Sequence, residues 1–288
     1  MTPTAKSLIL DLLSTMGGAA IPVRALVRAG ELFGVGENGI RVELARLGAR
    51  GIVERDERGR YRVTEQAAAV QSHVRAWSRV EERTTAWNGG WIGVHTGALK
   101  RSDRRAARRR RRAFDFLGFR ALDPGLWIRP DNLRGGVAEV RRQLEALGLD
   151  AAAIVFALGA LDDATEARAR RLWDVARLRA SYRAMREALA ASERRLPRLA
   201  TERAMVETFT LGGRAIRELV LDPLLPEPIV PAAERRALVD GMRRYDRVGR
   251  DCWRPFMRTH GAPNHRTPTD SRLMSGDRDL AVAAGGLP

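Results

Sequence analysis

Three short amphipathic helices followed by a hairpin are predicted in the N-terminal part of the chain, and this pattern constrains the fold most. Leu8 and Leu12 lie four positions apart, which is the spacing of one helix face. Pro22 is placed to begin the second helix and Gly51 to end the third. The predicted helices cover residues 4–16, 22–29 and 37–50.

A hairpin is predicted directly after the third helix. Residues 52–55 (IVER) and 60–64 (RYRVT) have the composition of strands, and Asp56-Glu57-Arg58-Gly59 supplies the turn residues between them. Three helices followed by such a hairpin, or wing, are the pattern of a winged helix-turn-helix domain. In domains of this kind the recognition helix lies in the major groove of DNA.

The third predicted helix divides into two faces. At about 100° per residue, Ile40, Leu44 and Leu47 share one side and would pack on the first two helices. The opposite side suits a major groove, where arginine bonds a guanine edge and apolar side chains contact a thymine methyl group. The predicted DNA contacts are Arg41, Val42, Ala45, Arg46 and Arg50 on this helix and Arg58 and Arg60 on the wing. The alternative is a small packing domain whose third helix faces solvent.

The remaining sequence predicts an α+β, multidomain protein. Strands at WIGVHTG, LWIRP and AAIVFAL alternate with helices at residues 102–117 and 132–147, which indicates a central α/β domain of ferredoxin-like type. Further helices are predicted at residues 163–195, 199–220 and 232–252. The predicted parts are a winged helix-turn-helix domain (1–66), a connecting helix (67–86), the central domain (87–162), a C-terminal helical domain (163–258) and a mobile, polar tail (259–288).

The charge balance favours an anionic partner such as nucleic acid. The 288 residues include 51 Lys and Arg against 35 Asp and Glu, which gives a formal net charge of +16. Only Lys6 and Lys100 are lysines, so part of this arginine excess reflects composition rather than function. No run reaches the roughly 18 apolar residues of a membrane span, and the single cysteine, Cys252, excludes an internal disulfide. A cytoplasmic protein with no membrane partner is expected.

Three motifs suggest other chemistry, but the sequence around each of them does not support that interpretation. GVGENG matches a dinucleotide-binding loop, but a helix precedes it and a hairpin follows, where that fold needs parallel strands. A nuclease needs clustered carboxylates for a divalent cation, and the first central strand ends at His95 without an acid. Cys252, His260 and His265 lack the spacing of a four-ligand zinc site. No catalytic centre, metal or cofactor is expected, and the chain is predicted not to be an enzyme.

The most basic stretch, KRSDRRAARRRRRAFDFLGF at residues 100–119, predicts one amphipathic helix. Arginines cover its outer face, while Arg110 projects into the apolar face. Arg110 must therefore extend toward solvent or find a buried acceptor. A solvated face is the favoured interpretation, and contact with a phosphate of DNA or of a coenzyme A ligand is the alternative.

Three parts of the sequence carry a family resemblance. They are AKSLILDLL with GIRVELARLGARGIVERDERGRYRVTE, WNGGWIGVHTG with FLGFRALDPGLWIRPDNL, and RRLWDVARLRASYRAMREAL. Together they resemble the PaaX-like family of transcriptional regulators, the repressors of phenylacetic acid degradation, over residues 5–255. Arg41, Arg46 and Leu47 fit the recognition helix of that family, whereas Gly39 departs from it.

The resemblance implies a homodimeric repressor that binds a double-stranded operator, expected to be an inverted repeat, and that an aryl-coenzyme A thioester such as phenylacetyl-CoA releases. It also implies that the central domain has the ferredoxin-like fold of the small CRISPR adaptation nuclease (Cas2-like). Aromatic side chains suit an aryl ligand and arginine suits its phosphates, so Arg110, Trp127 and Tyr182 are the candidate effector-binding residues. The alternatives are an activator or a regulator with a different effector, a metal-dependent nuclease, and a nonspecific basic binder.

Overall fold

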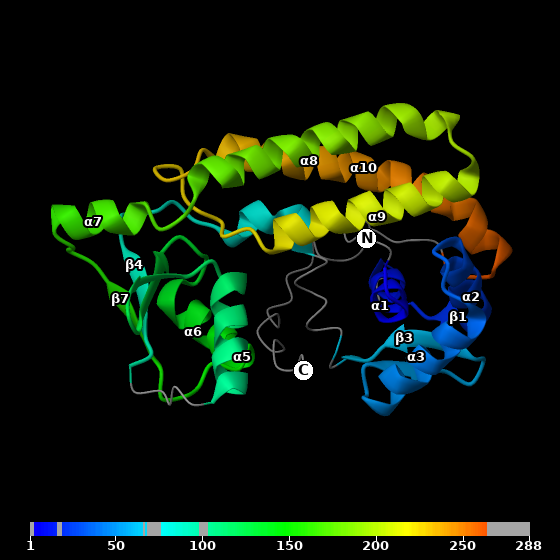
Figure 1. The fold of residues 1–288 in the computed structure, drawn as a ribbon, viewed down its shortest axis with the longest axis horizontal. Coiled ribbons are helices and arrows are strands. Elements are labelled where there is room, and N and C mark those ends of the chain that lie inside the picture. Colours follow the sequence, from blue (N-terminus) through cyan, green and yellow to red (C-terminus); the bar gives the residue numbers. More distant parts are fainter. Residues whose placement is uncertain (1–2, 16–18, 66, 68–75, 98–102, 264–288) are drawn as a thin grey trace. The chain divides into compact units, whose positions relative to one another are not determined.

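The computed structural model describes residues 3–15, 19–65, 67, 76–97 and 103–263 (Figure 1). These residues form a mixed α/β structure with two antiparallel sheets. They divide into two compact units. The first unit holds the described residues of Met1–Ser78, Glu187–Ile216 and Asp240–Ala283, and the second holds those of Arg79–Arg186 and Arg217–Val239. The domain boundaries expected from the sequence stay predictions.

The first unit contains the three predicted helices and the hairpin. Its N-terminal elements are α1 (Ala5–Thr15), β1 (Ile21–Pro22), α2 (Val23–Leu32), α3 (Glu37–Ala49), β2 (Val53–Arg55) and β3 (Arg60–Val63). Strand β3 lies between β1 and β2 and is antiparallel to both. The sequence does not predict β1. Pro22, expected as the first residue of the second helix, instead precedes it with an extended ψ of 139°.

The core of the first unit joins its N-terminal helices to α9 (Thr201–Val220) and α10 (Ala232–Thr259). Leu8 and Ile40 are completely buried, and Met205 and Trp253 belong to the same cluster. The indole N–H of Trp253 donates to the Met205 carbonyl at 3.1 Å. Because burial of one such apolar side chain contributes about 1.5–3 kcal/mol, α9 and α10 stabilise the N-terminal helices.

The second unit contains a four-stranded sheet with a βαββαβ order of elements. They are β4 (Trp91–His95), α5 (Arg104–Phe116), β5 (Arg120–Asp123), β6 (Leu126–Pro130), α6 (Gly136–Ala146) and β7 (Ile154–Leu158). The strands are antiparallel in the order β5-β6-β4-β7. Phe114 of α5 is fully buried and its ring lies 4.8 Å from that of Trp127 on β6. The sequence predicts three of these strands and misses β5, which is short and irregular at Ala121/Asp123.

The single long helix predicted at residues 163–195 is wrong. The chain forms α7 (Asp163–Arg170) and α8 (Val175–Arg195), with a break between them. The break places the Trp173 side chain in the core, where it is 5% exposed and its indole N–H donates to the Gly118 carbonyl at 3.1 Å. A tertiary contact therefore overrides the helical periodicity of this stretch.

The connecting segment also differs from the continuous helix predicted at residues 67–86. Its described part contains the 3-10 helix η1 (Ala76–Arg83), which kinks at Arg79, and an isolated bridge joins Thr84 to Leu133. Residues 68–75 lie outside the described ranges.

The C-terminal helices begin close to where the sequence predicts them. Helix α9 follows the 3-10 helix η2 (Leu196–Arg198), and α10 continues to Thr259 with Pro255 inside it, beyond the predicted end at residue 252. The predicted mobile tail lies outside the described residues from 264 onward. None of the helices in the described ranges is long and apolar enough to cross a membrane.

Candidate nucleic-acid interface

Helix α3 presents the two faces that the sequence predicts. On the inner face Ile40, Leu44 and Leu47 are at most 1% exposed. The outer face carries the predicted DNA contacts, all of them exposed: Arg41, Val42, Ala45, Arg46 and Arg50. Val42 is an apolar side chain with 40% of its surface exposed. This face therefore offers guanidinium donors beside small apolar groups, which is the mixture that reads base edges in a major groove.

A close approach between α2 and α3 fixes the position of this face. Gly30 of α2 lies so near α3 that a Cβ atom would sit 2.8 Å from Ile40 Cγ1 and 2.9 Å from the Val35 carbonyl oxygen. The Val35 N–H donates to the Gly30 carbonyl at 2.9 Å. The glycine-rich stretch at residues 34–39 is the turn between the two helices and the start of α3, in agreement with the sequence interpretation.

Each of the two arginines of α3 forms an ion pair with a glutamate of the same helix. Arg41 Nε lies 2.7 Å from Glu37 Oε1, and an Arg46 nitrogen lies 3.7 Å from Glu43 Oε2. Exposed pairs of this kind contribute about 0.2–1 kcal/mol. Both guanidinium groups can therefore exchange a glutamate for a phosphate or a guanine edge at little cost.

The wing is shaped by Asp56. Its carboxylate accepts hydrogen bonds from the backbone N–H groups of Arg58 at 3.0 Å and Arg60 at 2.8 Å. Gly59 has a φ of +72°, which favours glycine. Arg58 is exposed and Arg60 is partly exposed, as predicted DNA contacts must be.

The hairpin carries two further exposed arginines that the prediction omits. Arg55 extends over the turn beside Gly59, and Arg62 pairs with Glu54 across the strands. The alternation around the buried Val63 could have indicated that Arg62 points outward.

The three candidate effector-binding residues belong to the second unit and differ in their surroundings. Arg110 on α5 is half-buried. Trp127 packs against Phe114, and the guanidinium carbon of Arg111 lies 5.2 Å from its ring centroid. Tyr182 on α8 is 2% exposed. No hydrogen bond, ring contact or cation–π contact in the described part of the chain joins Arg110, Trp127 and Tyr182, and their role in effector binding stays a prediction.

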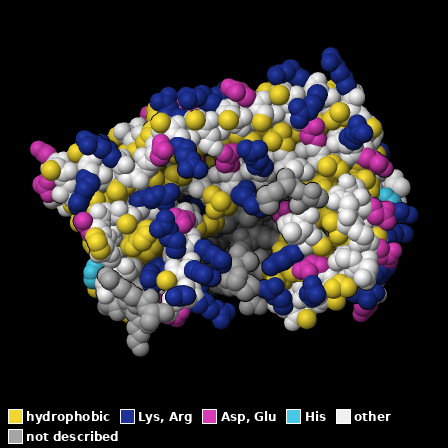
Figure 2. All heavy atoms as spheres, in the orientation of Figure 1, with side chains coloured by type: hydrophobic (Ala, Val, Ile, Leu, Met, Phe, Trp, Pro, Cys, Tyr) yellow, Lys and Arg dark blue, Asp and Glu magenta, His cyan; other side chains and the backbone are white. Residues whose placement is uncertain are grey.

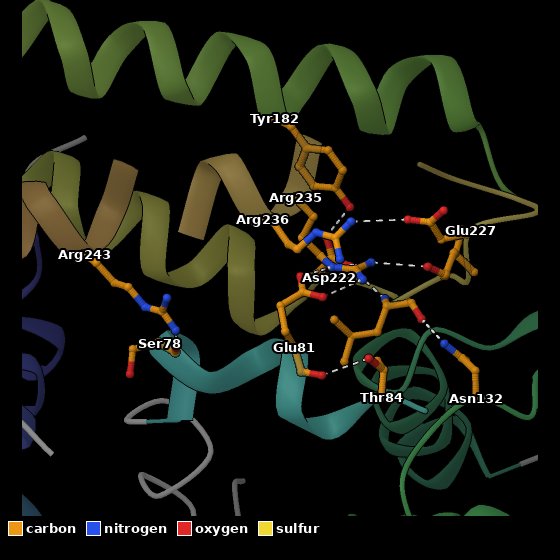
Figure 3. Close-up of polar contacts among 12 residues, drawn as sticks. Ser78, Glu81, Thr84, Asn132, Tyr182, Asp222, Glu227, Arg235, Arg236 and Arg243 are labelled. Carbon is orange, nitrogen blue, oxygen red and sulfur yellow. Dashed lines mark hydrogen bonds and ion pairs between the residues drawn. The ribbon is translucent and has the colours of Figure 1, made fainter. Parts of the chain in front are cut away.

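Tyr182 instead belongs to a buried polar network (Figure 3). Its hydroxyl donates to Asp222, whose carboxylate also accepts the Leu224 N–H at 2.7 Å. Arg235, 2% exposed, lies 3.7 Å from Asp222 and donates to Glu81 at 2.7 and 3.2 Å. Burial raises the pKa of Asp222 and, together with the charge of Asp222, that of Tyr182. Burial disfavours the charged form of Arg235, but the hydrogen bonds that Arg235 donates to Glu81, together with the negative charges of Asp222 and Glu81, outweigh burial and raise the pKa of that guanidinium.

The buried arginine of the central sheet is Arg129, which is not among the residues predicted from the sequence. It is 1% exposed and donates to the Pro130 carbonyl at 3.1 Å, to Asn132 Oδ1 at 3.0 Å and to the Leu117 carbonyl. Burial, together with the charge of Arg83, lowers the pKa of Arg129 to about 9. A cation inside the apolar strand LWIRP is the signal that could have identified it.

The motifs considered for metal chemistry do not form a site in the described part of the chain. There, no group of three or more His, Cys, Asp or Glu side chains could hold a metal ion. Cys252 is half-buried, and burial raises the pKa of its thiol. His95 is exposed at the end of β4, and His265 lies outside the described residues.

Comparison with known proteins identifies a family that the N-terminal elements resemble. Residues 4–67 match the PaaX family, described as PaaX-like protein. The match covers α1 to α3 and the β2–β3 hairpin, and it confirms the resemblance over this segment. No curated protein matches the chain.

A solved structure extends the likeness to most of the chain. It is the "Uncharacterized protein Rv0674 from Mycobacterium tuberculosis", which is 25% identical with a TM-score of 0.58. The alignment covers 86% of this chain and 98% of that chain. The name of that protein assigns no activity, so this similarity bears on the fold.

Proposed function

We propose that this protein is a sequence-specific DNA-binding transcriptional repressor. In this proposal residues 1–66 form a winged helix-turn-helix domain, residues 87–162 a ferredoxin-like domain and residues 163–258 a helical domain. The observation that carries the proposal is the exposed face of α3, which lies in the segment that matches the PaaX-like family.

The proposed roles follow from side-chain chemistry. Arg41 and Arg46 bond guanine edges or phosphates, and Val42 and Ala45 contact thymine methyl groups. On the wing, Arg58 and Arg60 bind phosphate or the minor groove. Phosphate contacts supply affinity and orientation, while base contacts supply the sequence preference.

The controlled genes are proposed to be those of an aromatic-acid catabolic operon of phenylacetate type. A homodimer binds two half-sites of an inverted repeat, and an aryl-coenzyme A thioester such as phenylacetyl-CoA favours a state that no longer fits their spacing. Arg110 and Trp127 are proposed to contact this effector directly. Tyr182 is buried against Asp222 and would act through that contact.

The DNA-binding proposal is tested by titrating the DNA upstream of the protein's own gene in a fluorescence anisotropy assay. Arg41→Ala and Arg46→Ala should each weaken binding by about tenfold, because one good base contact contributes about 1–3 kcal/mol. Arg198→Ala, at an exposed arginine of η2, is the matched control. Unchanged affinity in both α3 variants would reject α3 as the recognition helix.

The effector proposal is tested with the same DNA complex. Phenylacetyl-CoA should release the protein, whereas coenzyme A and phenylacetate added separately should not. A reporter gene under the same promoter distinguishes a repressor from an activator, since loss of the protein raises expression in the first case and lowers it in the second.

A further inference from the structure

Helix α5 carries an unusual excess of cations. Its 13 residues include seven arginines and a single carboxylate, Asp115. Four of these arginines are exposed and fall within about 100° of the helix circumference at 3.6 residues per turn. They form the α5 stripe: Arg104, Arg105, Arg108 and Arg112. No carboxylate in the described ranges forms an ion pair with any of the four.

The remaining exposed arginines of α5 have structural contacts. Arg109 donates to the Gly148 carbonyl at 3.1 Å. Arg111 donates to Asp115 at 3.1 Å and lies over the Trp127 ring. These contacts hold α5 on the sheet domain and separate the two residues from the α5 stripe.

The α5 stripe is unfavourable for the isolated helix. Arg104, Arg108 and Arg112 repeat at four-residue intervals, and like charges at this spacing repel one another. Arg104 and Arg105 also lie at the helix N-terminus, where the macrodipole disfavours cations. The first turn contains no acid, and only the N-cap Asp103, which accepts from the Arg105 and Ala106 N–H groups at 2.9 Å, offsets them.

The arginine-rich composition alone does not explain this arrangement. Helix α10 has eight arginines interleaved with four carboxylates. Arg243 pairs with Asp240 at 3.0 Å, and Arg250 pairs with Asp246 at 3.3 Å. Arg254 also pairs with Asp251, so three of the eight α10 arginines have a carboxylate partner on their own helix, whereas none of the four α5 stripe arginines has an ion-pair partner in the described ranges.

We propose that the α5 stripe is a second DNA-contacting surface, which binds backbone phosphates of duplex DNA without reading the sequence. The proposal rests on the proposed DNA-binding function. Figure 2 shows basic side chains gathered over the region of α5. Arg104 and Arg112 are separated by about 12 Å along the helix, and duplex DNA offers one negative charge per about 1.7 Å of its axis. Guanidinium forks match phosphate geometry, and phosphate contact relieves the repulsion along the stripe.

The test compares binding of the full chain to two 40-base-pair duplexes, one of random sequence and one from upstream of its own gene, between 50 and 200 mM salt. The stripe variant is R104Q/R105Q/R108Q/R112Q, in which glutamine keeps a high helix propensity. The control R177Q/R186Q/R194Q/R198Q removes the same charge from exposed positions of α8 and η2. Circular dichroism establishes that each variant is folded.

The stripe variant should bind both duplexes more weakly by the same factor, on the order of tenfold or more. The slope of log affinity against log salt should become shallower by about 3–4, since each phosphate contact contributes about 0.9. The control should keep a slope within about one unit of the wild type.

Three outcomes would overturn the inference. The first is an unchanged salt slope in the stripe variant, and the second is an equal change of slope in the control. The third is a stripe variant that loses binding to vesicles containing phosphatidylglycerol but keeps its binding to DNA. Failure of the proposed function gives a different result, because the wild type would then bind both duplexes equally and R41A/R46A would have no larger effect on the upstream duplex than on the random one.

Discussion

Arg235→Met is expected to destabilise the second unit mainly through the carboxylate that it leaves behind. Asp222 is 5% exposed, and its carboxylate lies 3.7 Å from the Arg235 guanidinium. Removal of one partner of a buried ion pair costs about 3–5 kcal/mol because the remaining charge stays desolvated. Glu81 contributes less to this cost because 27% of its side chain is exposed to water.

The control is the same substitution in a protein that also carries Asp222→Asn. The asparagine side chain is neutral, similar in shape to aspartate and able to accept the hydrogen bond from the Tyr182 hydroxyl. In this background Arg235→Met should cost only about 1–2 kcal/mol, the value for lost hydrogen bonds. The coupling between the two positions should therefore be about 2–3 kcal/mol. Guanidinium chloride unfolding at pH 7, followed by tryptophan fluorescence, measures the four free energies of unfolding.

The cost should also depend on pH. Burial raises the pKa of Asp222 above 3.8, so the folded state binds this proton more tightly than the unfolded chain and loses stability as pH rises above 3.8. Because the charge of Arg235 opposes this shift, its removal raises the pKa further. The destabilisation by Arg235→Met should shrink as pH falls from 7 toward 4. Equal costs in both backgrounds, or at both pH values, would refute the reasoning.

Three other substitutions test the site. Gly30→Ala places a methyl group 2.8 Å from Ile40 Cγ1, so it should lower the stability of the first unit by about 1–3 kcal/mol in thermal unfolding, whereas Gly213→Ala, with open space around it, should not. Asp56→Ala removes two hydrogen bonds that shape the wing and should weaken DNA binding in the anisotropy assay; unchanged affinity would exclude the wing from the interface. Tyr182→Phe removes a buried hydrogen bond to a carboxylate and should cost about 1.5–3 kcal/mol in chemical unfolding, and a smaller loss would mean that the hydroxyl is dispensable.

The candidate interface could be predicted from the sequence, because the residue spacings that define it are local. The spacing of Ile40, Leu44 and Leu47 defines the buried side of α3 and thereby the exposed side with Arg41 and Arg46. The wing was accessible for the same reason, since its turn depends on neighbouring residues. The bases that these side chains would contact in the proposed complex depend on the DNA sequence and are not encoded in helical spacing.

The surroundings of the candidate effector-binding residues could not be predicted as well, because they come from distant parts of the chain. Tyr182 has the pattern of an ordinary core residue, and its partner Asp222 lies 40 positions away. Arg110 is predicted to be a cation on an apolar helix face, yet it is only half-buried. The fully buried cation is Arg129, whose acceptors Leu117 and Asn132 lie in different segments.

By itself, the sequence determined most of the helices and strands, the two faces of α3 and the turn of the wing. Each of these depends on periodicity or on residues within a few positions of one another. Only the tertiary structure decided the break at Trp173, the extra strand β5 and the extension of the N-terminal core into α9 and α10. The reason is physical: the free energy of these features comes from contacts such as that between Trp173 and Gly118, 55 positions apart, which local propensity does not contain.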